Sequence, residues 1–456
     1  MHFKMKLFFV YLASISITSF TFCQKKISPW QPMFNGKDLS DYNQKGGTAK
    51  YEIRNGELIG TTVMNTPNSF LCTNKMYGDF ILEFETKTPN DINSGVQIRS
   101  NSYENYMNGR VHGYQVEVDP SPRAFSAGIY DEGRRKWLYT LDGNEAAQKA
   151  FKKEDWNHYR VEAIGSTIKT WINGVPASYL IDDYNKSGFI AMQVHSIAPK
   201  PELEGQEIKW RKVRIITKNA AKYQRKSTAK IINTSNKLVG TEEVDGWRLL
   251  WNGKNTDGWR GAKLTTFPEK GWVIKNGELR VVGSNGGEST GGGDIVTIEK
   301  HGNFEFKADF KITRGANSGI KYFVDTDLNK GEGSSIGLEF QILDDAVHPD
   351  AKLGNHEGSR TMGSVYDLIK ANDKKLVFTI GEWNTAHIKC RGTKVEHWLN
   401  GEKILEYDRA SPEYKQLVQE SKYKVWANFG EAETGQILLQ DHGNAVSFKN
   451  IKIREL

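Results

Sequence analysis

Two stretches of the sequence, 113–119 and 337–345, carry polar side chains at every second position. That spacing puts the polar groups on one face of a β-strand and the apolar groups on the other. Amides and carboxylates on such a face can bind hydroxyl groups and exchange protons, which is the chemistry of a sugar site. A plainly solvated strand face has the same pattern. The polar residues are Gln115, Glu117 and Asp119 in the first stretch, and Glu339 and Gln341 in the second.

A glutamine and a histidine share a strand face near the end of each half of the chain. Histidine exchanges protons near neutral pH, so the two histidines join the two glutamates as candidate catalytic groups. A lone histidine is also common as an ordinary surface residue. The pairs are Gln193 with His195, and Gln440 with His442.

The loops after the two stretches are dense in charged and aromatic residues. Carboxylates and guanidinium groups hydrogen-bond sugar hydroxyls, and an aromatic face stacks on the sugar ring. A salt-bridged surface loop has a similar composition. Together with the four glutamines already named, the candidate substrate-binding residues are Arg99, Asp119, Arg123, Tyr130, Arg135 and Trp137 in the first half, and Asp344, His348, Lys352, Arg360 and Tyr366 in the second.

Other chemistries lack their sequence signals. The sequence has no Cys/His spacing typical of zinc, no phosphate-binding glycine loop and no Gly-x-Ser-x-Gly elbow. No cofactor is indicated with certainty. A divalent cation held by Asp344, Asp345 or Asp350 stays open as an alternative, although no fixed ligand spacing identifies it.

An internal repeat organises the elements that must position these residues. Matching residues recur at offsets that rise in order along the chain, from 217 for Trp30 and Trp247 to 247 for His195 and His442. Offsets that rise without crossing indicate a tandem duplication. The last increase is explained by extra residues around 411–433 in the second copy.

Within each copy the hydrophobic pattern alternates with period two, as in Phe304–Phe310, and Asn-Gly pairs mark tight turns. Strong helical patterns are few, the best being 145–152 and 413–422. We therefore predict an all-β protein of two antiparallel β-sandwiches, each of about 190 to 210 residues. The predicted domains are 28–218 and 243–456, joined by an exposed linker over 219–242 that is rich in Lys, Ala, Ser and Thr.

The N-terminus and the composition bear on location and partners. Lys4 and Lys6 precede a short apolar run, which predicts a signal peptide over 1–23 and export to the periplasm or medium, with no membrane span in the mature chain. A lipoprotein attached through Cys23 is less favoured. The modest positive charge argues against a nucleic-acid partner. The content of 38% hydrophobic and 26% charged residues excludes disorder and coiled coil, and Cys72 and Cys390 are expected to be unpaired.

Taken together, these motifs resemble the 3-keto-disaccharide hydrolase family, long known as a domain of unknown function. The similarity covers nearly the whole mature chain as two family domains. The opening pattern at 34–39, echoed at 251–255, also fits. The stretches that carry the resemblance are 113–119, 128–132 and 193–196 in the first copy, and 337–345, 348–352, 360–361 and 366–368 in the second.

The resemblance implies a concanavalin A-like jelly-roll fold and cleavage of glycosides whose C3 hydroxyl has been oxidised by a partner sugar 3-oxidoreductase. A C3 ketone acidifies the proton on C2, so a base can remove it, the C1 oxygen leaves, and water adds to the enone. The copies differ in where the glutamate stands on the strand, so they are expected to differ in substrate, or one copy only binds. A non-catalytic glycan-binding protein and an ordinary glycosidase remain alternatives.

Roles follow from side-chain chemistry within this mechanism. In the first copy the base is His195 or Glu117, with Arg99, Arg123 and Arg135 as donors and Trp137 as the stacking partner. In the second copy the base is Glu339 or His442, with His348, Lys352 and Arg360 as donors.

Overall fold

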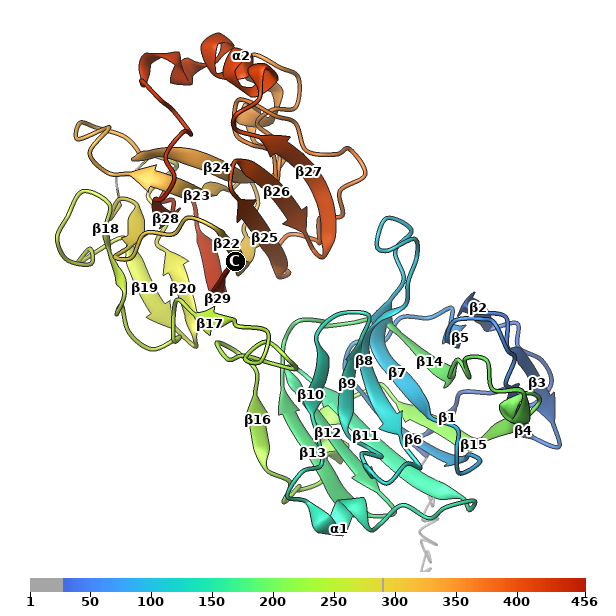
Figure 1. Cartoon of the computed structure of the whole chain (residues 1–456). Coiled ribbons are helices and arrows are strands. Elements are labelled where there is room, and N and C mark those ends of the chain that lie inside the picture. Colours follow the sequence, from blue (N-terminus) through green and yellow to red (C-terminus); the bar gives the residue numbers. More distant parts are fainter. Residues whose placement is uncertain (1–27, 289–290) are drawn as a thin grey trace, which may run out of the picture.

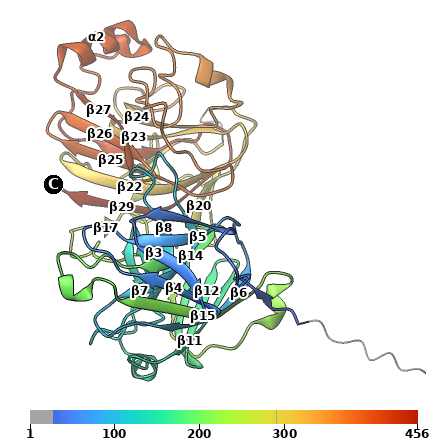
Figure 2. The ribbon, with the colours of Figure 1, turned by 90° about the vertical axis from the view of Figure 1, so that its right-hand side faces the viewer.

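A computed structural model describes residues 28–288 and 291–456 of the chain, so the predicted signal peptide at 1–23 lies outside the described residues. Figure 1 shows two β-rich domains, the first coloured blue to green and the second yellow to red. Figure 2, turned by 90°, shows the second domain stacked on the first. Each repeat has folded as a two-sheet sandwich of jelly-roll type, so the all-β prediction is confirmed.

The first domain packs a nine-stranded sheet against a seven-stranded sheet. The nine-stranded sheet runs β16-β13-β12-β11-β6-β15-β4-β3, with β1 paired to β15. Its strands are β1 (Gln31–Pro32), β3 (Lys50–Arg54), β4 (Glu57–Thr61), β6 (Phe80–Lys87), β11 (Asn157–Ile164), β12 (Thr167–Ile172), β13 (Val175–Ile181), β15 (Glu207–Ile216) and β16 (Ile231–Asn233).

The seven-stranded sheet runs β10-β9-β8-β7-β14-β5-β2 and carries the predicted polar strand. Its strands are β2 (Tyr42–Gly46), β5 (Ser69–Thr73), β7 (Ser94–Asn101), β8 (His112–Val118), β9 (Ile129–Glu132), β10 (Lys136–Tyr139) and β14 (Phe189–Val194). Short helices in this part of the chain are α1 (Glu145–Gln148), η1 (Pro201–Leu203) and η2 (Ala220–Tyr223).

The second domain repeats the arrangement with an eight-stranded and a five-stranded sheet. The eight-stranded sheet contains β17 (Arg248–Leu249), β19 (Trp272–Lys275), β20 (Glu278–Val281), β22 (Phe304–Ile312), β25 (Asn384–Arg391), β26 (Lys394–Leu399), β27 (Glu402–Asp408) and β29 (Val446–Glu455). The five-stranded sheet runs β18-β21-β28-β23-β24, namely β18 (Trp259–Gly261), β21 (Ile295–Thr297), β28 (Gln436–Leu439), β23 (Asn317–Asp325) and β24 (Ile336–Leu343). Its short helices are η3 (Pro349–Lys352), α2 (Pro412–Glu420) and η4 (Lys422–Val425).

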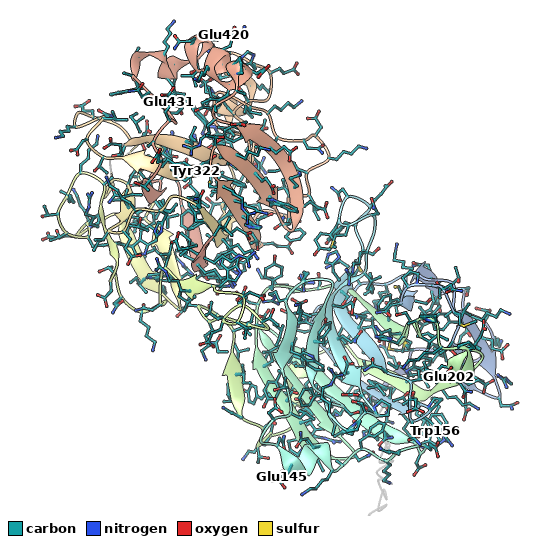
Figure 3. All side chains as sticks on the ribbon, viewed as in Figure 1. Glu145, Trp156, Glu202, Tyr322, Glu420 and Glu431 are labelled. Atoms are coloured by element: carbon teal, nitrogen blue, oxygen red, sulfur yellow. The ribbon has the colours of Figure 1, made fainter. Side chains whose placement is uncertain are left out.

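Both cores lie between the paired sheets, as the period-two pattern requires. On β8, Tyr114, Val116 and Val118 face the first core, which leaves Gln115 and Glu117 on the outer face of the seven-stranded sheet. In the second core Tyr322 hydrogen-bonds His397 and Tyr407, and Figure 3 shows its side chain inside the sandwich. The polar candidates therefore project from the outer face of one sheet.

Two predicted local features can be compared with the structure. The predicted helices are shorter than expected, since α1 spans Glu145–Gln148 and α2 spans Pro412–Glu420. In the region expected to be an exposed linker, β16 adds to the first domain as a parallel strand beside β13. Polar contacts also hold the two domains together across this junction. For example, Asp183 accepts hydrogen bonds from Trp383 and Lys449, and Asn236 exchanges backbone-to-side-chain bonds with Asn450.

The described residues show neither a disulfide bond nor a membrane-spanning helix. Cys72 and Cys390 are free, as predicted, and both are buried. Over 28–288 and 291–456, no helix is long and apolar enough to cross a bilayer.

Candidate active site

A cleft of about 310 Å³ lies on the outer face of the seven-stranded sheet. It gathers side chains from β8, β9, β10 and β14 and from the segments before β5 and β7. Seven of its lining residues are sequence-predicted site residues: Gln115, Glu117, Arg123, Tyr130, Trp137, Gln193 and His195. Four were not predicted: Asn68, Asn93, Arg110 and Glu132.

Glu117 is held in the cleft by two amide donors. Asn93 donates to Oε1 at 2.6 Å and Gln115 donates to Oε2 at 2.8 Å. Gln115 in turn accepts a hydrogen bond from Gln97 at 2.6 Å. Burial raises the pKa of Glu117 to about 7, against the opposing effect of the two amide donors. A carboxyl group with this pKa can gain or lose a proton near neutral pH.

A glycine makes room for this network. Gly95 on β7 lies opposite Glu117 on β8, and a Cβ at Gly95 would come within 2.5 Å of the Gln115 side chain. A side chain at this position would therefore displace Gln115 and break its hydrogen bond to Glu117.

Gln193 lies in the same cleft with its carboxamide unpaired. The side chain is fully buried, and neither Nε2 nor Oε1 has a hydrogen-bond partner among the described residues. A buried polar group without a partner costs about 1 to 3 kcal/mol. The amide is therefore a strong candidate to bind a polar ligand in the cleft.

His195 presents a basic nitrogen in the cleft. Its Nδ1 lies 2.6 Å from the carbonyl oxygen of Ser196, which can only accept a hydrogen bond. Nδ1 must therefore carry the proton, and Nε2 of the neutral ring keeps its lone pair. The side chain is half-buried, so Nε2 can accept a proton from a ligand.

Glu132 gives the cleft a second carboxyl group. It is 7% exposed and pairs with Arg110 at 3.3 Å. Burial raises its pKa, while Arg110 and His195 oppose that rise. Glu132 and His195 both line the cleft.

The aromatic wall of the cleft is built around Trp137. Phe125 and Tyr130 meet its ring edge-on, with centroids 5.1 and 5.2 Å away. The guanidinium of Arg123 lies over the ring at 4.9 Å and is also bound by Asp119 at 2.8 Å. The ring of Trp137 thus has three neighbouring side chains that hold it in place, which suits stacking against a sugar.

Three predicted binders of the first repeat lie outside this cleft. The guanidinium of Arg99 is buried and bonds the carbonyl oxygens of Gly78 and Gly165. Arg135 pairs with two aspartates and lines a pocket between the domains instead. Asp119 is buried and holds Arg123. Arg99 and Arg135 thus bind other groups of the protein and do not line the cleft. Asp119 contributes to the cleft only by holding Arg123.

The second repeat carries the corresponding residues with one exchange. Gly319 lies opposite Gln341, as Gly95 lies opposite Glu117. Because the two glycines match in the repeat, Gln341 occupies the position of Glu117, and Glu339 that of Gln115. Gln341 donates to Asn317 at 3.3 Å, which reverses the direction of the bond from Asn93 to Glu117.

Glu339 is part of a buried ionic network. Lys321 lies 3.6 Å from it at the position equivalent to Gln97, so a charged pair replaces a pair of amides. Lys321 also donates to Ser334 at 2.5 Å, and Ser334 donates to Asp294. All four side chains are at least nine-tenths buried. Burial raises the pKa of Glu339, while Lys321 opposes that rise.

The other predicted residues of the second repeat lie around Glu339 and the loops beside it. His348 accepts a hydrogen bond at Nδ1 from the backbone of Asp350, so its Nε2 carries the proton of the neutral ring. Its ring meets that of His442 edge-on, with centroids 6.5 Å apart. His442 Nδ1 and Gln440 Oε1 are buried and have no hydrogen-bond partner among the described residues.

The loop residues fall into two groups. Arg360 bonds Asp350 and Asp367, both at 2.8 Å, and lies 5.1 Å over the ring of Tyr366. The extra segment of the second repeat adds Lys422, whose Nζ lies 4.5 Å over that same ring. The carboxylate of Asp344 accepts a hydrogen bond from the backbone N–H of Gly315. The side chain of Lys352 is exposed to solvent.

The alternative of a divalent cation held by Asp344, Asp345 or Asp350 lacks a set of ligands among the described residues. Over the described ranges, no group of three or more His, Cys, Asp or Glu side chains could hold a metal. Asp345 pairs with Lys375 at 3.2 Å, while Asp350 pairs with Arg360 and Asp344 bonds the backbone. The three carboxylates are thus occupied by separate partners.

A family match covers residues 29–216 and 246–454, described as the 3-keto-alpha-glucoside-1,2-lyase-like domain. Both matched segments contain one of the sheet faces described above. The chain belongs to this family. The family assignment agrees with the resemblance noted in the sequence and classes the chain among glycoside-acting enzymes.

Several known proteins are similar to this chain. A protein of Bacteroides thetaiotaomicron named 3-keto-disaccharide hydrolase is 35% identical over 234 residues, which is 47% of this chain and 80% of the relative. Two crystal structures from Parabacteroides distasonis, each described as a candidate glycosyl hydrolase, are 32% and 29% identical. They cover 49% and 46% of this chain and 100% and 99% of their own, with TM-scores of 0.43 and 0.36.

Proposed function

We propose that this protein cleaves 3-keto-glycosides by removing the C2 proton, expelling the C1 oxygen and adding water to the enone. Family membership and the name of the B. thetaiotaomicron relative support this substrate class. The reaction needs a base near C2, polar groups that hold the sugar hydroxyls and a surface for the ring. The first-repeat cleft offers each of these.

The observation that carries the proposal is the unpaired carboxamide of Gln193 in the cleft. It can donate through Nε2 and accept through Oε1, a combination that fits neighbouring hydroxyl and carbonyl groups of an oxidised sugar. Gln440, its equivalent in the second repeat, has a buried Oε1 without a partner among the described residues. A polar substrate would give both amides their missing hydrogen bonds.

His195 is the better candidate for the base of the first repeat. Its Nε2 keeps a lone pair and its side chain reaches solvent, whereas both carboxylate oxygens of Glu117 accept amide hydrogen bonds. We assign Glu117 to binding a hydroxyl group of the substrate and Trp137 to stacking. In the second repeat the candidates are Glu339 and His442, and His348 can donate from Nε2.

Two further parts of the proposal concern the cell. The sequence pattern of 1–23 supports export, to the periplasm or the medium. The substrate carries a ketone at C3, so a sugar 3-oxidoreductase must act before this enzyme. Neither part depends on the geometry of the cleft.

Product analysis tests the proposal. The full chain is incubated with a 3-keto-disaccharide and, separately, with the unoxidised parent. We expect release of both sugars from the 3-keto compound alone. Turnover of the parent alone would favour an ordinary glycosidase, and binding without turnover of either would favour a glycan-binding protein.

Substitution of both candidate histidines tests the base. We expect His195→Asn combined with His442→Asn to lower kcat by roughly 10²- to 10⁴-fold, the usual contribution of a general base. His158→Asn is the matched control, because His158 is half-buried on the nine-stranded sheet, away from the cleft. Full activity of the double variant would remove both histidines from the mechanism.

A further inference from the structure

The first-repeat cleft continues into a second, larger compartment. This outer compartment has a volume of about 600 Å³ and shares three lining residues with the cleft, namely Asn68, Arg110 and Glu132. Ser196, which fixes the ring of His195, lines it as well. The two spaces therefore adjoin, with Glu132 among the residues between them.

The two compartments differ in chemistry. The cleft is lined by amides, carboxyl groups and aromatic rings. The outer compartment includes Phe70, Val111, Met107 and Pro67 in its lining. Phe70 and Val111 belong to a small buried apolar cluster on the outer face of the sheet. Its polar lining groups include Asn68, Asn108 and Arg110, and Arg110 hydrogen-bonds Glu132 at 3.3 Å. The outer compartment thus fits an uncharged group with an apolar face.

The second domain helps to build the outer compartment. Met107 lies in the loop between β7 and β8, and its backbone N–H donates to Glu402 of β27 at 2.6 Å. In the same loop, Asn105 donates to the carbonyl oxygen of Lys374 at 2.8 Å. This wall of the outer compartment is therefore held by the other repeat.

We propose that the outer compartment binds the leaving group of the glycoside and that Glu132 donates the proton to the departing C1 oxygen. The inference rests on the proposed function, because it assigns the leaving-group half of that reaction. The oxidised sugar then occupies the cleft beside Gln193 and His195, and the bond to be broken lies over the junction. The leaving group is an uncharged alcohol, either a second sugar or an aromatic alcohol.

The proton balance closes over two steps. In the first, His195 takes the C2 proton, the C1–O bond breaks toward oxygen, and the carboxyl proton of Glu132 passes to that oxygen to release the alcohol. In the second, the Glu132 carboxylate takes a proton from water while the water oxygen bonds to C1. The proton on His195 returns to C2, and both groups regain their starting states. Burial of Glu132 raises its pKa, which favours the protonated form that the first step needs.

The second repeat lacks this group. The backbone N–H of Tyr366 donates to the carbonyl oxygen of Glu339, and Tyr130 pairs with Gln115 between β9 and β8, so the two tyrosines occupy matching places. Counting two residues onward from each tyrosine reaches Glu132 in the first repeat and Leu368 in the second. Leu368 is buried in the second core, so the second repeat has no carboxyl group at this counted position.

Glu132→Gln tests the acid with two substrates that differ in their need for it. The second repeat is silenced in every sample by Glu339→Gln combined with His442→Asn, and the full chain is used. Release of 4-nitrophenol from its 3-keto-glucoside needs no acid, because 4-nitrophenolate leaves readily, whereas methanol leaves poorly. We expect the first-turnover rate of methanol release from the methyl 3-keto-glucoside to fall by roughly 10²- to 10³-fold and the first-turnover rate of 4-nitrophenol release to stay nearly unchanged.

The control is Glu52→Gln, which removes an exposed carboxylate paired with Arg54 at 2.8 Å on β3, outside the cleft. An equal loss of the first-turnover rate on both substrates after Glu132→Gln would indicate a structural role and overturn the assignment. Retention of activity on both would overturn it as well. If the parent chain turned over no 3-keto-glycoside at all, the proposed function itself would fail.

Glu402→Ala tests the compartment separately from the acid. Loss of the acceptor for Met107 should loosen the wall. We expect KM for a 3-keto-disaccharide to rise several-fold and KM for the methyl 3-keto-glucoside to stay the same. Equal KM changes for both substrates would argue against a leaving-group compartment.

Discussion

Replacing Glu117 with Gln should change how the stability of the first domain depends on pH. Glu117 is 4% exposed, and burial raises its pKa from 4.5 to about 7. Ionisation of this carboxyl group is therefore unfavourable in the folded state relative to the unfolded state. The wild-type protein keeps its full stability below pH 4.5 and loses part of it as pH rises through 7.

The shift from 4.5 to about 7 corresponds to about 3 kcal/mol at 1.4 kcal/mol per pKa unit. Gln cannot ionise, so Glu117→Gln does not incur this cost. The substitution should also keep a hydrogen bond, because Gln341 occupies the equivalent position and bonds Asn317. Relative to wild type, the variant should gain about 3 kcal/mol of unfolding free energy between pH 4.5 and pH 8.5.

Urea unfolding of the full chain at these two pH values measures the difference. Glu83→Gln is the matched control in the same domain. Burial disfavours ionisation of Glu83, but hydrogen bonds from His158, Arg214 and Arg160 outweigh it and lower its pKa to about 2. The Glu83 carboxylate is therefore stabilising above its unfolded pKa and loses this stabilisation only as pH falls from 4.5 toward 2, so Glu83→Gln should be about equally destabilising at pH 4.5 and pH 8.5.

A change in relative stability between these two pH values is thus expected of Glu117→Gln and not of Glu83→Gln. A stability difference between Glu117→Gln and wild type that does not change with pH would refute the reasoning. It would mean that Asn93 and Gln115 stabilise the ionised carboxylate enough to cancel the effect of burial.

Three further predictions concern other parts of the molecule. Trp137→Ala should raise KM for 3-keto-glycosides several-fold with little effect on kcat, because the ring contributes contact area rather than proton transfer. Lys321→Met should lower the unfolding free energy by about 3 to 5 kcal/mol in urea titrations, because Glu339 would stay buried without its cation, and adding Glu339→Gln should recover part of the loss. Cys72 and Cys390 should not react with a thiol reagent until the protein unfolds, since burial raises both pKa values, that of Cys72 to about 12.

Much of the fold follows from patterns that the sequence displays directly. Period-two alternation identified β6, β8, β22 and β24, and the Asn-Gly pairs located the hairpins β12–β13 and β26–β27. The repeat offsets predicted two matching sandwiches. The strand β16 was not predicted, because a three-residue strand in a polar segment pairs through its backbone and leaves no hydrophobic pattern.

The candidate site was predictable only in part. Strand parity placed Gln115, Glu117 and Gln193 on one face, since each side chain alternates with core residues. Strand parity could not show that Arg99 has a structural role rather than a ligand-binding one, because its partners are backbone carbonyl groups distant in sequence. Glu132 was missed although it ends a recognised motif. Only the pairing of β8 with β9 brings it beside the cleft.

The exchange of Glu and Gln between the repeats has a geometric consequence for the substrates. Moving a carboxylate by two residues along a strand displaces it by roughly 6.5 to 7 Å while keeping it on the same face. A sugar seated in the same way in both domains would therefore meet the carboxylate at opposite ends of its ring. The duplication has thus produced two outer sheet faces whose carboxylates differ in position along the strand.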